Sequence, residues 1–275
     1  MNPDIARRAE AFHALHQGPE LLVLANAWDA ASARLFESLG AKAVATTSAG
    51  VAWAHGYPDD DTLPLERLLA TVSAITRVIQ VPLTVDIEGG YSDDPAEVGA
   101  TVARLIEAGA VGINLEDGTG SPAALCEKLA HVKQASQRLG VRLFVNVRTD
   151  VYLRGLVPEA QRQQETLARA EQYRAAGADG LFVPALVDTA GLQAIAKGTT
   201  LPVNAMVHPG LPDGRELQRL GVRRLSSGAS IPKALWSQAS ALVSAFLADG
   251  RSEPLCNGAA SYVEVNAMMK PASRA

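Results

Sequence analysis

The chain has 275 residues, of which 48% are hydrophobic and 20% charged, a balance typical of a globular enzyme with a large core. A net charge of −4 without any run of Lys or Arg excludes the electrostatic footprint of a nucleic-acid-binding protein. Two cysteines, Cys126 and Cys256, exclude a disulfide framework. No stretch reads as a membrane span or a secretion signal, so we expect a cytoplasmic protein without a membrane partner.

Short β-rich runs alternate along the chain with amphipathic helical segments. Several helical segments end in a glycine followed at once by the next run, as in "AGAVG" and "AGADG", which is typical of a helix closed in the left-handed conformation. Eight such β-rich runs occur, at residues 21–26, 43–48, 83–88, 112–117, 143–148, 180–185, 201–206 and 223–228.

Apolar strands separated by helices are typical of a parallel sheet covered on both faces. Eight units predict one (β/α)8 TIM barrel domain over about residues 20–230, with a C-terminal helix and tail over 231–275. A doubly wound open sheet is the alternative. It is less favoured because "NAWDAAS" after the first run contains no glycine for a dinucleotide-binding turn.

Active sites of this barrel lie at the carboxyl ends of the strands. Polar side chains collect at those ends, whereas the strand beginnings are mostly apolar. The strand-end residues are Asn26, Thr47, Ser48, Asp86, Glu88, Glu116, Asp117, Asn146, Arg148, Asn204, Ser226 and Ser227.

The acids of two adjacent strands favour a cation site. Asp86 and Glu88 are two apart, so both should face the barrel mouth, beside Glu116 of the next strand. Such carboxylates repel one another unless a cation neutralises them, and Mg²⁺ takes one or two carboxylates directly while keeping several waters. Helix capping is the alternative for Asp86 and Glu88, but the next helix has its own start signal in "YSDDPAE". Asp117, in "DGTGSP", is better explained by a local turn.

An anion-binding function is indicated at two other strand ends. Arg148 ends the fifth run, where a guanidinium suits recognition of a substrate carboxylate; a salt bridge to Glu116 is the alternative. "TTSAG" after the second run offers the hydroxyl of Ser48 and the backbone N–H groups of Ala49 and Gly50.

Two chemistries are disfavoured by what the strand ends lack. No lysine ends a strand, which argues against a Schiff base, and the histidines lack the spacing of a zinc or iron site. The five histidines are His13, His16, His55, His131 and His208.

Over about residues 20–250, the segments "NAWDAASARLFESLGAKA", "TTSAGVAWAHGYPDDD", "VDIEGGY", "INLEDG", "VRTD" and "GVRRLSSGAS" together resemble the isocitrate lyase/phosphoenolpyruvate mutase superfamily. The resemblance implies that Asp86 binds Mg²⁺ directly, with Mn²⁺ as an alternative ion. It implies that three further acids act mainly through waters: Glu88, Glu116 and Asp59. It implies that the substrate is held by Ser48, Ala49, Gly50 and Arg148, with looser matches at Asn204 and Lys233.

This chain departs from the superfamily pattern in two places. Glu88 stands where many members have Asp, which lengthens the reach to the cation. The K-[KR]-C-G-H gating loop of the lyases is missing from "EDGTGSPAALCEKLAHVKQA". Cys126 falls near the place of the lyases' catalytic cysteine, as a candidate acid/base, but its surroundings have a helical pattern, and a buried helix cysteine is the alternative.

The resemblance implies a Mg²⁺-dependent carbon–carbon lyase on a small 2-oxo di- or tricarboxylate, with cleavage through an enolate like that of isocitrate or methylisocitrate, or with decarboxylation or hydrolysis of oxaloacetate. Arg148 and Glu116 would then be catalytic. The alternatives are P–C bond chemistry on phosphonopyruvate, and a 2-oxo acid binding protein without activity. The resemblance also implies a homodimer or homotetramer that exchanges the helix after the eighth strand; a helix packed on its own barrel has the same sequence pattern.

Overall fold

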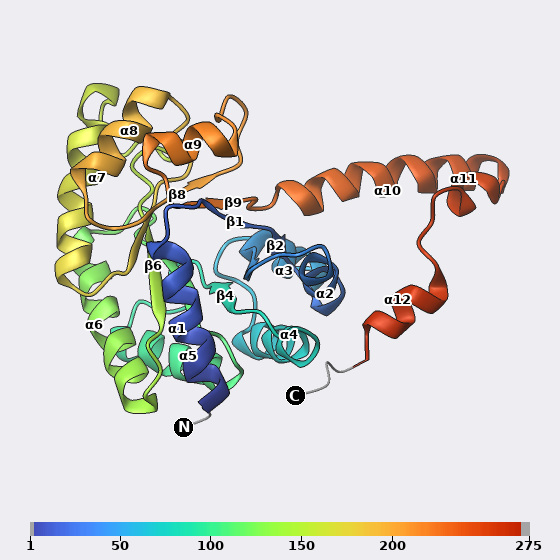
Figure 1. Ribbon diagram of the computed structural model, residues 1–275, viewed down its shortest axis with the longest axis horizontal. Helices are drawn as coiled ribbons and strands as arrows, with labels where there is room; N and C mark the ends of the chain where they lie inside the picture. Colours follow the sequence, from blue (N-terminus) through green and yellow to red (C-terminus); the bar gives the residue numbers. More distant parts are fainter. Residues whose placement is uncertain (1–2, 271–275) are drawn as a thin grey trace.

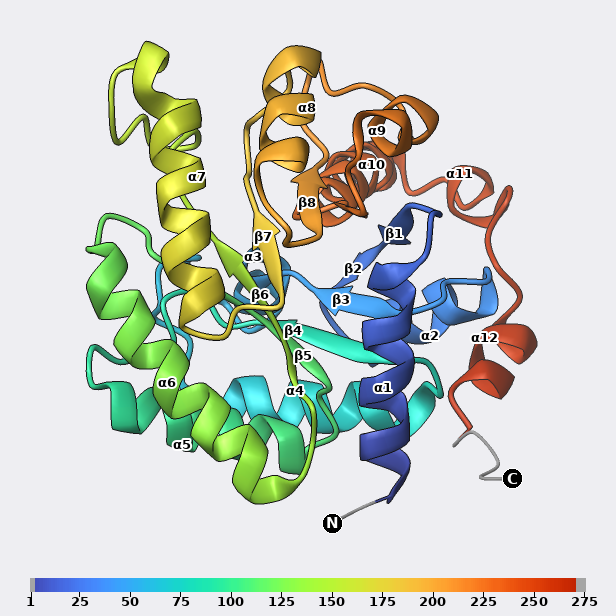
Figure 2. The same cartoon turned by 60° about the vertical axis from the view of Figure 1, so that its left-hand side comes forward.

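The computed structural model describes residues 3–270 as a parallel β-barrel surrounded by helices (Figures 1 and 2). All strand pairs are parallel, in the order β1-β9-β8-β7-β6-β5-β4-β3-β2. The strands are β1 (Leu22–Leu24), β2 (Asn26–Ala27), β3 (Val44–Thr46), β4 (Leu83–Asp86), β5 (Gly112–Glu116), β6 (Phe144–Arg148), β7 (Gly180–Phe182), β8 (Val203–Met206) and β9 (Arg224–Ser226).

The barrel closes through its first strand. β1 and β2 are two halves of one predicted run, separated at Ala25, and β1 pairs with β9 whereas β2 pairs with β3. The predicted (β/α)8 barrel is therefore confirmed, and the open doubly wound sheet is excluded. Several strands end earlier than predicted, because the residues after Thr46, Asp86 and Phe182 leave the ladder to enter loops and helices at the barrel mouth.

The barrel wall is covered by helices whose ends follow local capping rules. Asp94 caps α5 by accepting a hydrogen bond from the backbone N–H of Ala96 at 2.8 Å, and Gly140 ends α6 in the left-handed conformation. The helices of the barrel are α1 (Pro3–Gln17), α2 (Ala30–Ser38), α3 (Ser48–Ala54), α4 (Leu65–Val78), α5 (Pro95–Glu107), α6 (Pro122–Leu139), α7 (Glu159–Ala175), α8 (Thr189–Gly198) and α9 (Gly214–Leu220).

Helix α1 packs against the amino ends of the strands. Phe12 is fully buried and meets the ring of Phe144 at the start of β6, with the ring centroids 5.4 Å apart. A Cβ on Gly112, at the start of β5, would lie 2.7 Å from the Phe12 ring, so this position has room only for glycine. The site therefore has to form at the opposite, carboxyl end of the strands.

A buried histidine of α1 is expected to make the protein less stable at acid pH. The His16 ring stacks on Phe144 with centroids 3.9 Å apart; burial, and then the charge of Arg224, lower its pKa from 6.5 to about 3. Below pH 6.5 the unfolded chain gains a proton that the folded chain refuses, so stability falls as the pH falls. We expect His16→Phe to remove about 2 kcal/mol of the loss in unfolding free energy between pH 6.5 and pH 5.

The comparison is made by denaturant unfolding at both pH values. Burial also lowers the pKa of His13, which remains in the variant. The unfolding free energy of the variant should therefore still fall with falling pH, but less steeply. His208→Gln, at an exposed histidine, serves as the control and should keep the slope of the unchanged protein. Equal slopes for His16→Phe and the unchanged protein would contradict the assignment.

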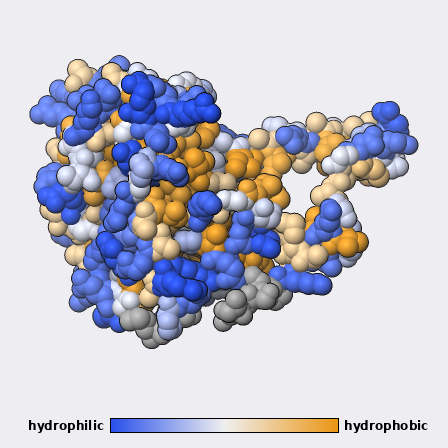
Figure 3. Space-filling model, in the orientation of Figure 1, coloured by the Kyte–Doolittle hydropathy of each residue, from blue (hydrophilic) through white to orange (hydrophobic). Residues whose placement is uncertain are grey.

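The C-terminal segment leaves the barrel. Helix α10 (Ser230–Asp249) projects from the body and has no buried residue, followed by α11 (Glu253–Cys256) and α12 (Tyr262–Met268) (Figure 1). Apolar side chains line α10 and the adjoining face of the barrel (Figure 3). The exposed large apolar residues of α10 include Leu235, Trp236, Leu242, Val243, Phe246 and Leu247. Across residues 3–270, no helix combines the length and apolar character that crossing a bilayer requires.

Candidate active site

The acids predicted from the sequence meet at the mouth of the barrel. Asp86 ends β4 and its backbone N–H donates to Thr46 Oγ1 at 2.8 Å. Glu116 ends the neighbouring β5, and its backbone N–H donates to the carbonyl of Glu88 at 3.0 Å. The carboxyl ends of β3, β4 and β5 are thus held in one arc, with Asp86 and Glu116 at adjacent strand ends. Glu88 is close enough to act on both by charge, but it lies beyond the end of β4 with a φ of 50°, so the strand spacing assumed for Asp86 and Glu88 is wrong.

Glu88 and two residues in contact with it have a backbone conformation that is unusual for residues other than glycine. The φ angles are 49° at Asp61, 50° at Glu88 and 60° at Tyr91. Glu88 links the three, since its Oε2 accepts from the Asp61 backbone N–H at 2.7 Å and its Oε1 from the Tyr91 hydroxyl at 3.3 Å. Such strain persists only where surrounding contacts hold it, and it is concentrated at functional sites.

Asp61 was not predicted as a site residue, whereas Asp59 was. The Asp61 carboxylate accepts from the backbone N–H of Gly89 at 3.3 Å, and so ties the 55–64 loop to the turn after β4. Asp59 contributes by charge, raising the pKa of both Asp86 and Glu88. The three aspartates of the run "DDD" are consecutive in the sequence, so only the loop conformation decides which one contacts the turn.

The site carboxyls resist ionisation. Burial, reinforced by neighbouring acids, raises the pKa of Glu88 to about 7. Burial also raises the pKa of Glu116 to about 8, although the positive charge of Arg148 opposes the rise. Burial likewise raises the pKa of Asp86, although Arg148 and the backbone N–H groups of Glu88 and Ser48 oppose the rise. A set of carboxylates with this mutual repulsion is one that a bound cation stabilises.

Arg148 ends β6 and is held by two acids. Its Nη1 donates to Glu116 Oε2 at 2.6 Å, while Nε and Nη2 donate to the two oxygens of Asp150 at 2.6 and 3.0 Å. The salt bridge to Glu116, considered as an alternative to substrate binding, is therefore present. The fully buried Asp150 was not predicted; it also accepts from Arg154 Nε at 2.8 Å, so one carboxylate orients two guanidinium groups.

Asp117 has a structural position, but its side chain is not used within the local turn that its surroundings predicted; its partners are distant in the chain. Its buried carboxylate accepts from Arg169 Nη1 at 2.8 Å, Tyr173 Oη at 2.6 Å, Thr149 Oγ1 at 2.8 Å and the Asp150 backbone N–H at 2.9 Å. These bonds join the end of β5 to the segment after β6 and to α7. Asp117 therefore fixes the position of Thr149 and Asp150, the two residues that follow Arg148.

Replacing Asp117 is expected to destabilise the protein strongly. Asp117→Ala leaves the guanidinium of Arg169, whose side chain is only 10% exposed, without its buried partner, and should lower the free energy of unfolding by about 3–5 kcal/mol. Denaturant unfolding measures the change. Glu171→Gln, which breaks the exposed pair with Arg174, is the control and should leave stability unchanged; a similarly small effect of Asp117→Ala would refute the buried-pair assignment.

The predicted anion-binding turn forms the first turn of α3. Ser48 follows Thr47 at the end of β3, and its backbone N–H favours the ionised form of Asp86. Gly50 is packed closely, since a Cβ there would lie 2.7 Å from Thr47 Cγ2 and 2.9 Å from Trp28 Cβ. Ser48 thus lies beside Asp86, and Ala49 and Gly50 follow it in the same helical turn; a substrate-binding function of this turn stays a prediction.

The remaining predicted residues lie in different surroundings. Asn204 is fully buried in β8, where its amide nitrogen donates to Ser226 Oγ at 3.2 Å. Lys233 is exposed near the start of α10 and lines a small surface hollow with Trp53 and Trp236. Cys126 lies on α6 with its Sγ 3.7 Å from the carbonyl of Gln172 in α7, so its thiol faces the helix layer and is not among the strand-end residues.

The donors at the barrel mouth suit a hard divalent cation held largely through waters. They are carboxylate oxygens, but among residues 3–270 no three His, Cys, Asp or Glu side chains lie close enough together to hold a metal ion, so the predicted acids Asp86, Glu88, Glu116 and Asp59 do not form one ligand cluster in this structure. Oxygen donors of this kind suit Mg²⁺, which takes one or two carboxylates directly and completes its shell with waters and substrate oxygens. They do not fit the closed nitrogen and sulfur sites of zinc.

Comparison with known proteins agrees with this arrangement. A family described as phosphoenolpyruvate phosphomutase matches residues 12–247. Oxaloacetate decarboxylase 1 of Pseudomonas fluorescens (strain Pf0-1) is 30% identical over 72% of this chain and 71% of its own length.

Two solved structures share the fold. A crystal structure from Burkholderia cenocepacia J2315, provisionally assigned as a phosphonomutase, has a TM-score of 0.82 and 39% identity, covering 86% of this chain and 99% of its own. Phosphonopyruvate hydrolase in complex with oxalate and Mg²⁺ has a TM-score of 0.83 at 21% identity over 95% and 94% of the two chains, a likeness of fold. This chain belongs to the phosphoenolpyruvate phosphomutase family, within the isocitrate lyase/phosphoenolpyruvate mutase superfamily indicated by its strand-end residues.

Proposed function

We propose that the protein is a Mg²⁺-dependent carbon–carbon lyase that acts on a small 2-oxo di- or tricarboxylate. The observation that carries the proposal is the convergence of Asp86, Glu88 and Glu116 beside Arg148 and the Ser48 turn. Hard oxygen donors and a carboxylate-binding group at one barrel mouth suit a substrate that presents a carboxylate and an adjacent carbonyl. The oxaloacetate decarboxylase relative, by its name, acts on a substrate of this class.

The residues have distinct proposed tasks. Asp86 would hold the cation directly, and Glu88, Glu116 and Asp59 would hold its waters. The bound Mg²⁺ supplies Lewis acidity at the 2-oxo group. Arg148 and the N–H groups of Ala49 and Gly50 orient the substrate carboxylate, and Arg148 also stabilises negative charge that develops on the neighbouring oxygen. Glu116 keeps Arg148 in place through the 2.6 Å ion pair.

A turnover panel tests the proposal. The purified protein is assayed with oxaloacetate, isocitrate, methylisocitrate and phosphonopyruvate in Mg²⁺ or Mn²⁺, then after chelation and re-addition of the metal. Metal-dependent turnover of a carboxylate substrate is the expected result. Turnover of phosphonopyruvate alone would instead support P–C bond chemistry, and metal-dependent 2-oxo acid binding without any turnover would identify a binding protein.

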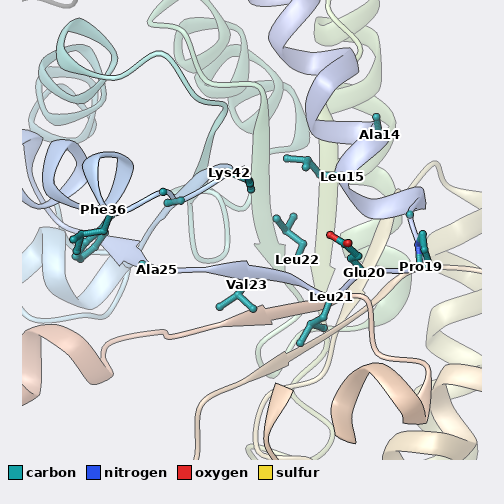
Figure 4. Close-up of a pocket in the computed structure, with 14 residues that line it drawn as sticks. Ala14, Leu15, Pro19, Glu20, Leu21, Leu22, Val23, Ala25, Phe36 and Lys42 are labelled. Carbon is teal, nitrogen blue, oxygen red and sulfur yellow. The ribbon is translucent and has the colours of Figure 1, made fainter. Parts of the chain in front are cut away.

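We propose, in addition, that two copies of the chain exchange α10. On the barrel, β1 has its outward side chain Val23 58% exposed, in a hollow of about 600 Å³ lined mostly by apolar residues (Figure 4). Leu15, Leu22 and Phe36 of the body line the same hollow, and α10 of the same chain points away from the body (Figures 1 and 4). The apolar α10 of a second copy is the matching occupant.

Replacing Val23 tests this exchange. Val23→Glu places a charge in the hollow and should convert the oligomer to monomers, because burying an unpaired carboxylate opposes association. Light scattering coupled to size-exclusion chromatography gives the mass directly. Leu153→Glu, at an apolar side chain 42% exposed on the segment after β6, should leave the mass unchanged. A monomeric unchanged protein, or an oligomer unaffected by Val23→Glu, would overturn the proposal.

A further inference from the structure

A second, polar cavity adjoins the barrel mouth. It has a volume of about 740 Å³ and is lined by Glu116, by the loop from Gly89 to Asp93, by residues 117–121, and by Lys128 and Arg154. Glu116 belongs both to the strand-end group and to the cavity lining, so the cavity lies next to the strand ends, although Asp86 and Arg148 do not line it. What the cavity offers to a ligand is set by its charges.

The two cations that line this cavity differ in their free donors. Lys128 has a side chain only 13% exposed, and its Nζ donates to the Gly89 carbonyl at 2.8 Å. Arg154 has a side chain 50% exposed, and its Nε donates to Asp150 Oδ2 at 2.8 Å. Neither Nη group of Arg154 donates to any atom within residues 3–270, and Arg154 lines the cavity, so this planar pair of donors is available to a ligand there.

Arg154 is held in a definite relation to Arg148. The fully buried Asp150 accepts from Arg148 Nε and Nη2 with its two oxygens and from Arg154 Nε with one of them. One guanidinium therefore lies at the strand ends and a second lies at the adjoining cavity, both oriented by the same carboxylate. Five acids line the cavity: Glu116 and Asp117 are paired with Arg148 and Arg169, and Asp60, Asp61 and Asp93 belong to other loops. An anion that enters the cavity therefore meets its favourable contacts on the Arg154 side.

We propose that Arg154 binds a second carboxylate of the substrate and thereby selects 2-oxo di- or tricarboxylates over 2-oxo monocarboxylates. This inference rests on the proposed function, in which the first carboxylate lies near Arg148. Paired Nη donors match a carboxylate in bidentate geometry. Decarboxylation converts a carboxylate into neutral CO₂, and a guanidinium bound to that carboxylate opposes the loss of its negative charge. The carboxylate bound by Arg154 is therefore one that the reaction retains.

The test measures binding, which does not depend on turnover. Titration calorimetry in Mg²⁺ compares pyruvate with 2-oxoglutarate and with the non-enolisable 3,3-difluorooxaloacetate. Arg154→Met keeps the aliphatic stem and should weaken the two dicarboxylates by about 10–100-fold while leaving pyruvate within about twofold. Arg154→Lys, which keeps the charge without the paired donors, should fall between the two. Arg219→Met, at an exposed arginine on α9, is the control and should change nothing.

The outcomes separate this inference from the proposed function. If the unchanged protein fails to bind pyruvate and both dicarboxylates in Mg²⁺, the proposed function fails. If it binds them and Arg154→Met weakens pyruvate as much as the dicarboxylates, Arg154 acts through Asp150 on the whole site and the selectivity assignment is wrong. If Arg154→Met binds both dicarboxylates as tightly as the wild-type protein does, the proposal that Arg154 binds the second carboxylate is wrong. The unfolding midpoints of both Arg154 variants verify that each is folded. If Arg154→Met is unfolded, the affinities of Arg154→Lys for pyruvate and the dicarboxylates test the proposal.

Discussion

Asp86→Asn is expected to abolish Mg²⁺ binding at the barrel mouth and to reduce turnover by about a thousandfold or more, because the remaining acids hold the cation only through waters. Asparagine has the shape of the aspartate, so the backbone bond from Asp86 to Thr46 Oγ1 at 2.8 Å is retained. Calorimetric titration with Mg²⁺ and steady-state kinetics on the best substrate of the panel measure the two effects.

Glu107→Gln is the control for this experiment. Glu107 is an exposed acid at the end of α5 and does not line the cavity beside the barrel mouth. Its replacement should leave Mg²⁺ affinity and turnover unchanged. If Asp86→Asn retains the Mg²⁺ affinity of the unchanged protein, the assignment of the metal site to the end of β4 is wrong.

Arg148→Lys is expected to lower kcat/KM by about a hundredfold to a thousandfold. Lysine keeps the positive charge but cannot bind Glu116 and both oxygens of Asp150 while also facing the substrate, because these contacts use the planar fork of the guanidinium. A loss that falls on kcat as well as on KM would show that Arg148 stabilises the transition state and not the bound substrate alone.

Steady-state kinetics are compared with those of Arg219→Lys, at a surface arginine that pairs with Glu216. That control should retain full activity. The free energy of unfolding is measured in parallel, because the fully buried Asp150 carboxylate loses hydrogen bonds from its positively charged partner in Arg148→Lys. An Arg148→Lys variant that is folded and fully active would remove Arg148 from the catalytic group.

Charge balance accounts for both expectations. Asp150 neutralises parts of Arg148 and Arg154, while Glu116 shares Arg148 with it. Asp86, Glu88 and Glu116 are left with raised pKa values. A divalent cation at this point offsets the mutual repulsion of the acids, and the two guanidinium groups remain to meet anionic parts of a substrate. The same arrangement supports a substrate with more than one carboxylate.

Some site residues were missed because their signal in the sequence is weak. Asp150 follows Arg148 by two residues in "VRTD", a spacing that places both on one face of an extended segment, and it could have been read as a partner for the arginine. Asp61 had no such signal within "DDD". Arg154, in an irregular segment after β6, is related to the site through its bond to Asp150 and through the cavity that it lines together with Glu116, both of which are tertiary contacts.

The sequence by itself determined the alternation of strands and helices, the closed barrel, and the collection of Asp86, Glu116 and Arg148 at one end of it. These follow from local periodicity, because residues at the ends of successive parallel strands meet whatever the loops do. Tertiary structure alone decided that Asp61 contacts Glu88, that Asp117 is buried against α7, that the Cys126 thiol faces α7, and that α10 leaves the barrel. Each of these depends on partners distant in the chain, whose positions no local pattern encodes.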